Sequence, residues 1–185
     1  MISPINPRAR QDRFGRKINR DHSRILALSI PWLTVLIGSL VPLLPIITPV
    51  PVVPPLAFIT MLAWRLVRPG LLPLWAGVPF GLVDDLFSGQ PFGSGILLFS
   101  LALIAIEALE MRFPWRSFFQ DWLTASVLIT AYLLCCWLFS GAIPGHVQLT
   151  VIVPQILLSL VLFPVIARMV SVFDRFRLMR VRRVG

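Results

Sequence analysis

Long apolar runs dominate the chain from Ile25 to Phe173, and Gly, Pro or charged residues bound each run. A helix needs about 20 apolar residues to cross the hydrocarbon layer, because each residue adds about 1.5 Å. A soluble protein would interrupt such runs with polar positions at helical or strand period. The pattern therefore predicts five transmembrane helices, at residues 25–44, 71–87, 95–111, 122–140 and 149–173.

A sixth, shorter apolar segment lies between the first two of these runs. Several prolines precede or begin this segment, and each removes a backbone N–H donor and clashes sterically with the continuation of a helix. These are Pro45, Pro49, Pro51, Pro54 and Pro55. Within this segment, only residues 54–67 are therefore expected to form a regular helix.

Composition supports the bilayer as the solvent of this chain. Of the 185 residues, 57% are apolar and 14% are charged, and the mean hydropathy is +0.84. Soluble domains are about half apolar and a quarter charged. The first run is longer than the apolar core of a signal peptide and lacks a small-residue cleavage pattern, so it is predicted to be a true span.

Charge decides whether the short segment crosses the membrane. The net charge is +9, and the 17 Lys and Arg residues occupy four islands, at 8–24, 65–68, 112–116 and 168–183. Basic residues in short loops stay on the cytoplasmic side. Six crossings with a cytoplasmic N-terminus place every basic residue inside, whereas ten lie outside if residues 54–67 do not cross. The islands therefore predict six helices with both termini cytoplasmic, rather than a nucleic-acid surface.

This topology divides the chain into a basic N-terminal tail at 1–24, a six-helix domain at 25–173 and a basic C-terminal tail at 174–185. The tails interleave Arg with apolar residues, which favours binding to anionic lipids and leaves open a cytoplasmic partner. The outer loops, at 45–53, 88–94 and 141–148, contain no Lys or Arg. Four tryptophans are expected at the cytoplasmic interface: Trp64, Trp75, Trp115 and Trp122.

Four acidic residues fall inside predicted spans, where ionisable groups are costly and suggest function. Glu107 and Glu110 lie near a cytoplasmic end, so we expect them to snorkel or to pair with Arg112 and Arg116. Glu107 and Glu110 therefore indicate a function less strongly than the other two acids do.

Asp84 and Asp85 lie near the outer mouth of their span, before a Gly- and Pro-rich loop without a positive partner. One carboxylate is expected to face interfacial water, and the other to face the bundle or the amides of the next loop. A structural or partner-docking role is favoured over binding of an ion or a substrate, and catalysis is disfavoured because no base accompanies the acids.

The remaining reactive side chains suggest no active site. His22 and His146 are expected on opposite sides of the membrane, and Cys135 and Cys136 are adjacent, which suits neither a disulfide framework nor a metal site. No metal or cofactor is expected. Gly77 and Gly81 form a small-xxx-small pair, which predicts close helix packing within the chain rather than dimerisation.

The stretch GLVDDLFSGQPFG at 81–93 resembles the best-known segment of the rod shape-determining protein MreD family. The matching positions are Gly81, Asp85, Leu86, Ser88, Gly89 and Gly93. Residues 55–64 and the Arg68–Pro69 pair are also similar to that family. Asp84 is an additional acid, and the prolines between residues 42 and 55 are unusually dense.

The resemblance implies a multi-pass protein of the bacterial cell inner membrane that has no active site. It implies a scaffold of the cell-wall elongation complex, which binds MreC, helps to maintain cell shape and connects MreB filaments to peptidoglycan synthases. It also implies a fold like the substrate-binding subunits of energy-coupling-factor transporters. A vitamin-binding subunit is therefore the main alternative, and an enzyme or a secondary transporter is the third.

Overall fold

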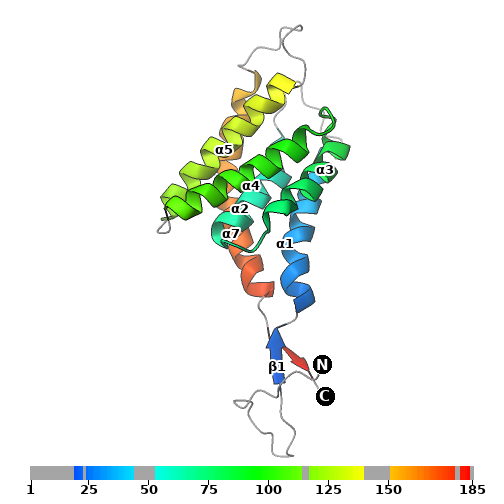
Figure 1. The fold of residues 1–185 in the computed structure, drawn as a ribbon, viewed down its shortest axis with the longest axis vertical. Coiled ribbons are helices and arrows are strands. Elements are labelled where there is room, and N and C mark those ends of the chain that lie inside the picture. The colour runs from blue at the N-terminus through cyan, green and yellow to red at the C-terminus, as the bar shows by residue number, and fades with distance from the viewer. Residues whose placement is uncertain are drawn as a thin grey trace, which may run out of the picture.

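The computed structural model describes residues 19–22, 24–43, 53–113, 117–139, 151–177 and 180–183, with only the backbone described at 19–27 and 180–183. A helical bundle forms its body, and a short pair of strands lies at one end of it (Figure 1). The elements in chain order are β1 (Asn19–His22), α1 (Arg24–Ser39), the 3-10 helix η1 (Val41–Leu43), α2 (Leu56–Val67), the 3-10 helix η2 (Leu74–Ala76), α3 (Gly77–Ser88), α4 (Ser94–Arg112), α5 (Phe118–Phe139), α7 (Val153–Arg177) and β2 (Arg180–Arg183).

Three of the described helices, α4, α5 and α7, are long and apolar enough to cross a membrane. The helix α1 has 16 residues, and α2 and α3 have 12 each. Twelve residues extend about 18 Å, which is less than the hydrocarbon core of about 30 Å. The chain is therefore a membrane protein that combines long helices with shorter ones.

The predicted span at 71–87 is wrong over its first part. Residues 71–76 form a bend and η2, and the α-helix starts at Gly77. Gly70 has a φ of +78°, and Pro73 precedes η2 in an extended conformation. Hydropathy counts apolar residues, but it does not register that this backbone turns before it becomes helical.

Several other helix ends differ from the predicted ones. The helix α1 ends at Ser39, and the next turn is η1, which contains Pro42. The helix α5 begins at Phe118 rather than residue 122, and α7 continues to Arg177. Residues 174–177, expected in the C-terminal tail, are thus the last turn of a helix.

The bundle is all-helical as predicted, and a short pair of strands lies within the segments predicted as tails. β1 and β2 pair antiparallel, with Asn19 opposite Arg183 and His22 opposite Arg180. Pairing between segments so far apart leaves no local hydrophobic period, so the sequence did not predict it. The predictions for the first 18 residues, Trp115, residues 45–52 and the 141–148 loop with His146 lie outside the described residues.

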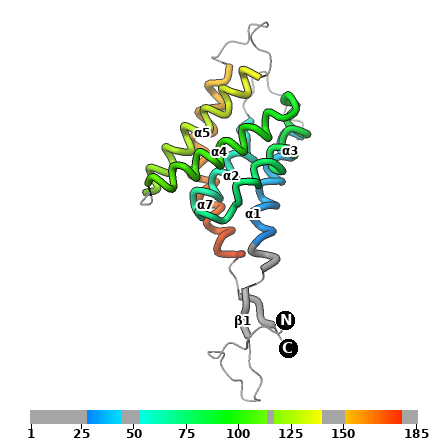
Figure 2. The backbone as a smooth tube through the Cα atoms, viewed as in Figure 1, coloured from blue at the N-terminus to red at the C-terminus, as the bar shows by residue number. Residues whose placement is uncertain are grey.

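The short helix α2 is the centre of the bundle. It contacts α1, α4, α5 and α7, and Figure 2 shows it among them. Its residues are buried almost continuously from Ala57 to Leu66, as expected for a helix that is apolar on all sides. Phe58 stacks on Tyr132 of α5 with ring centroids 4.1 Å apart, and meets the edge of Phe99 of α4 at 5.2 Å.

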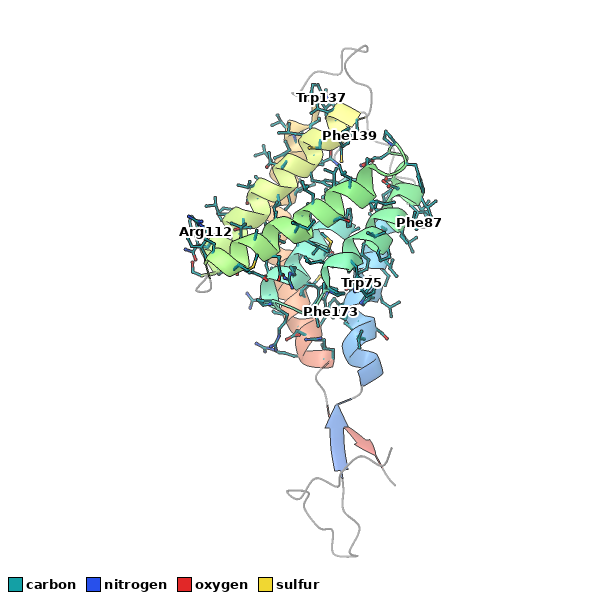
Figure 3. The ribbon with its side chains drawn as sticks, in the orientation of Figure 1. Trp75, Phe87, Arg112, Trp137, Phe139 and Phe173 are labelled. Atoms are coloured by element: carbon teal, nitrogen blue, oxygen red, sulfur yellow. The ribbon has the colours of Figure 1, made fainter. Side chains whose placement is uncertain are left out.

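The outer faces of the bundle are apolar. On α4, Leu97, Leu101 and Ile104 are each more than half exposed, and on α7 a similar stripe includes Val161 and Val165. Figure 3 shows side chains projecting outward along these helices. Continuous apolar exposure of this kind needs lipid rather than water as its neighbour.

A proline inside α7 is compensated by a neighbouring helix. Pro164 has no N–H, so it cannot donate to the carbonyl of Leu160, its partner in a regular α-helix. The indole Nε1 of Trp122 in α5 donates to that carbonyl instead, at 3.1 Å. Such replacement partners allow proline inside membrane helices.

Candidate functional site

The carboxylate of Asp85 connects α3 to the beginning of α4. Its Oδ2 accepts a hydrogen bond from the backbone N–H of Gly93 at 2.8 Å, and its Oδ1 accepts one from Gly95 at 2.7 Å. Longer contacts, both at 3.4 Å, come from the N–H of Ile96 and the hydroxyl of Ser94. Asp85 therefore binds the amides of the next turn, which is one of the two arrangements expected from the sequence.

This contact replaces a missing N-cap. The N-cap position of α4 is Gly93, which has no side chain to accept the free N–H groups of the first turn. An N-cap side chain normally binds the second or third of these groups, and the helix N-terminus also favours negative charge. Asp85 provides both functions from the preceding helix.

Two glycines shape the backbone between the helices. Gly89 ends α3 with a φ of +68°, and Gly93 precedes α4 with a φ of +97°. A Cβ at either position would meet nothing within 4 Å, so conformation rather than space favours glycine there. The turn thus requires glycines at two of the six positions that match the MreD pattern.

A third glycine brings the two helix backbones into contact. A Cβ on Gly81 would lie 2.5 Å from the carbonyl carbon and oxygen of Gly95, and one on Gly77 would lie 2.7 Å from the Cα of Ser100. Both contacts are between α3 and α4. Gly77 and Gly81 therefore pack within the chain.

Asp84 lies in a separate polar cluster. It accepts a hydrogen bond from the Tyr132 hydroxyl of α5 at 3.2 Å, and the buried hydroxyl of Ser39 lies beside it. The Cys136 thiol is 3.3 Å from the amide oxygen of Gln90. The exposed fractions of Asp84 and Asp85 are 6% and 5%, so neither faces interfacial water as expected.

Two other residues of the motif differ in environment. Leu86 is 63% exposed, whereas the hydroxyl of Ser88 is buried without a hydrogen-bond partner among the described residues. Phe92, in the turn, is 70% exposed. The exterior of the α3–α4 turn is consequently apolar at Leu86 and Phe92.

At the opposite end of α4, an arginine that the sequence analysis did not single out forms a buried charge cluster. Arg65 of α2 is 2% exposed and pairs with Glu107 and, at 2.8 Å, with Glu110. The expectation that these acids pair with arginine is correct in kind, but the partner that the described residues show comes from another helix, and Arg116 lies outside those residues. The presence of Arg65 within an apolar helix was the available signal.

A second charge cluster joins the ends of α2 and α7. Asp174 accepts hydrogen bonds from Nε of Arg68 at 2.7 Å and from Nε of Arg177 at 2.6 Å. The guanidinium of Arg177 also lies 5.7 Å from the ring centroid of Trp64. Arg68 follows Arg65 by one helical turn, so both clusters are at the same end of the bundle.

Two of the expected interfacial tryptophans are in other environments. Trp64 is fully buried and donates from Nε1 to the hydroxyl of Thr34 at 2.8 Å, so it faces the interior of the bundle rather than lipid headgroups. Trp122 is half-buried and donates a hydrogen bond to the carbonyl of Leu160, while Trp75 is 63% exposed. Packing around α2 decided the position of Trp64.

The described part of the chain contains no group of three or more His, Cys, Asp or Glu residues suited to a metal ion. Cys135 and Cys136 are free thiols. Comparisons of the chain with protein-family models, curated proteins and solved structures find no match. The resemblance to MreD therefore rests on the sequence motif.

Proposed function

We propose that the protein is a non-catalytic membrane scaffold of the bacterial cell-wall elongation complex, similar in role to MreD. The observation that carries the proposal is the structure of the motif at 81–93. Gly81 permits close helix packing, Asp85 caps α4, and Gly89 and Gly93 form the turn. A carboxylate that binds its own backbone is suited to maintaining a shape rather than to exchanging protons with a substrate.

The exterior of the same turn is the proposed contact with a partner. Leu86 and Phe92 are exposed next to the capped carboxylate, on a backbone that the Asp85 hydrogen bonds restrain. A preorganised apolar surface binds a partner without a large cost for ordering it. The proposed partner is an MreC-like protein, with MreB-like filaments and peptidoglycan synthases recruited directly or indirectly.

Affinity purification from native membranes tests this function. The tagged full chain is expected to recover MreC-like and MreB-like proteins, and its depletion is expected to round the cells. Replacing both Leu86 and Phe92 by Ser should reduce recovery, whereas replacing Leu97 and Leu101 of α4 by Ser tests an equally exposed apolar pair outside the turn. Equal losses for the two double variants would reject the turn as the docking surface.

We also propose that all six segments cross the inner membrane, with both termini cytoplasmic. The ion pairs of Arg65 and Arg68 bring the C-terminal ends of α2, α4 and α7 together. The β1–β2 pair brings the chain before α1 to the chain after α7. This arrangement supports a common cytoplasmic side for the basic islands, as the positive-inside rule requires.

One observation favours the alternative of a vitamin-binding transporter subunit. Polar side chains from α1, α3 and α5 converge around Asp84, and such sites use a few polar groups in an apolar surrounding. Copurification of an ATPase pair with a bound vitamin would support this alternative and overturn the scaffold. If the scaffold proposal is correct, Tyr132→Phe changes the recovery of the MreC-like protein only as far as it changes the amount of folded protein.

A further inference from the structure

A cleft of about 410 Å³ opens between α2, α5 and α7, at the end of the bundle that contains the charge clusters. Leu66 of α2, Phe118 of α5 and Phe163 and Ala167 of α7 form much of its apolar lining. Phe118 is 63% exposed, so the cleft reaches the outer surface of the bundle. Its walls are suited to a hydrocarbon chain.

The cleft also contains a positive charge. Arg168 lines it and is exposed, and it takes part in none of the ion pairs that the described residues form. Arg65, Arg68 and Arg177, by contrast, all pair with carboxylates. Arg168 is therefore available to a ligand of the cleft.

Two other polar residues line the cleft. Asp121 lines the cleft, but it already has an interaction within the protein. The Ser171 hydroxyl donates to the backbone carbonyl of Arg168 at 2.7 Å, which places it at the same rim. The cleft thus combines an apolar wall with Arg168, Asp121 and Ser171.

Depth in the bundle favours a lipid over a soluble anion. Arg168 precedes Asp174 by six residues, or about 9 Å along α7, so its long side chain can extend from the apolar zone toward the headgroups. Basic pockets between membrane helices at this level bind lipid headgroups. A partner helix, about 10 Å wide, is too large to be enclosed in a cleft of about 410 Å³.

We propose that this cleft binds one phospholipid, with its phosphate on Arg168 and an acyl chain along Leu66, Phe163 and Ala167. The site does not depend on the proposed scaffold function. It differs from attraction of anionic lipids to the basic tails because it needs a defined apolar wall and a single arginine.

Native mass spectrometry of the full-length, delipidated protein in mild detergent tests the site. Titration with phosphatidylglycerol is expected to show one lipid retained more strongly than any others. Arg168→Gln should weaken that step on the order of tenfold, as expected for loss of one charge-assisted contact. The control is Arg175→Gln, which changes an exposed arginine of the same helix outside the cleft lining and should leave this step unchanged.

A second variant tests the apolar wall without a change of charge. Ser171→Phe, at the half-buried rim, should also weaken retention while the unfolding temperature stays near that of the wild type. Equal weakening by the Arg168 and Arg175 variants would overturn the proposal, because the effect would be general electrostatics. Diacylglycerol retained as strongly as phosphatidylglycerol would remove the role of Arg168, and inorganic phosphate displacing the lipid at equal concentration would identify a free-anion site.

Discussion

Asp85 is a membrane-segment carboxylate that is stabilised by backbone amides rather than by a cation. The sequence showed no positive partner for it, and the structure supplies the N-terminus of α4, where unpaired N–H groups carry partial positive charge. Its role could be foreseen in part, because the acid precedes a Gly-rich turn and a helix. The role of Asp84 could not be foreseen, because Tyr132 is 48 residues away.

Replacing Asp85 by Ala should destabilise the α3–α4 hairpin, because the amides of Gly93, Gly95 and Ile96 would lose their acceptor. The expected cost is about 1–3 kcal/mol, in the range for unpaired buried polar groups. Thermal unfolding in detergent, followed by tryptophan fluorescence, measures it. Leu86→Ala is the control, because Leu86 is exposed on the next position of the helix, and an equal effect of the two variants would contradict the capping role.

Glycine is needed at Gly81 and at Gly89 for two different reasons, which are space and backbone conformation. Gly81→Ala places a Cβ against the backbone of Gly95, which cannot move as a flexible side chain can, so α3 and α4 must separate. Gly89→Ala meets open space and costs only the left-handed conformation, about 1–2 kcal/mol. We expect a lower unfolding temperature for Gly81→Ala than for Gly89→Ala, and the reverse order would show that the helices tolerate a wider spacing.

At the scale of elements, α2 is a short helix that brings arginine into the bundle. Its apolar residues meet four neighbouring helices, while Arg65 and Arg68 reach carboxylates on α4 and α7. Helix α2 was predicted from its proline boundary and its apolar composition. The central position of α2 was not predicted, because packing between segments that are distant in the sequence determines which helices are neighbours.

Arg65→Leu should be strongly destabilising, because Glu107 and Glu110 would remain close together without their buried cation. Loss of one member of a fully buried ion pair costs about 3–5 kcal/mol, and the cost expected here is smaller because the Glu107 side chain is 39% exposed to solvent. The triple variant with Leu at Arg65, Glu107 and Glu110 should recover much of the loss, since it removes all three charges. Arg175→Gln, at an exposed site, controls for loss of an arginine, and a triple variant no more stable than Arg65→Leu would argue against the charge cluster as the cause.

At the scale of the whole molecule, charge and apolar surface are segregated. Arg112 lies at one side of the bundle, at the C-terminal end of α4, and Trp137 and Phe139 lie toward its top (Figure 3). The ion pairs lie at the C-terminal end of α4, and the capped α3–α4 turn is at the far end of α4. This polarity along the bundle is the arrangement that the positive-inside rule favours.

Single cysteines in a background without Cys135 and Cys136 test the number of crossings. Six crossings predict that Pro69→Cys, after α2, reacts with an impermeant maleimide only in permeabilised cells, whereas Phe92→Cys, in the α3–α4 turn, reacts in intact cells. The opposite pattern would overturn this topology, because it requires either that α2 does not cross or that the orientation is reversed. Reaction of both in intact cells would mean that neither α2 nor α3 crosses.

The sequence by itself determined the membrane environment and the approximate positions of the helices. Both depend on local properties: the hydropathy of each run and the prolines and glycines that end it. The number of crossings remains a prediction from charge. The sequence also indicated that one carboxylate near the turn could bind the amides of the following segment.

Only the tertiary structure decided which carboxylate caps α4, that Trp64 is buried, that Arg65 pairs with Glu107 and Glu110, and that two strands join the chain near its ends. Each of these features depends on groups that are distant in sequence. In an apolar solvent a buried polar group must find a partner inside the protein. Which partner it finds is set by the packing of the helices, and an apolar run does not encode that packing locally.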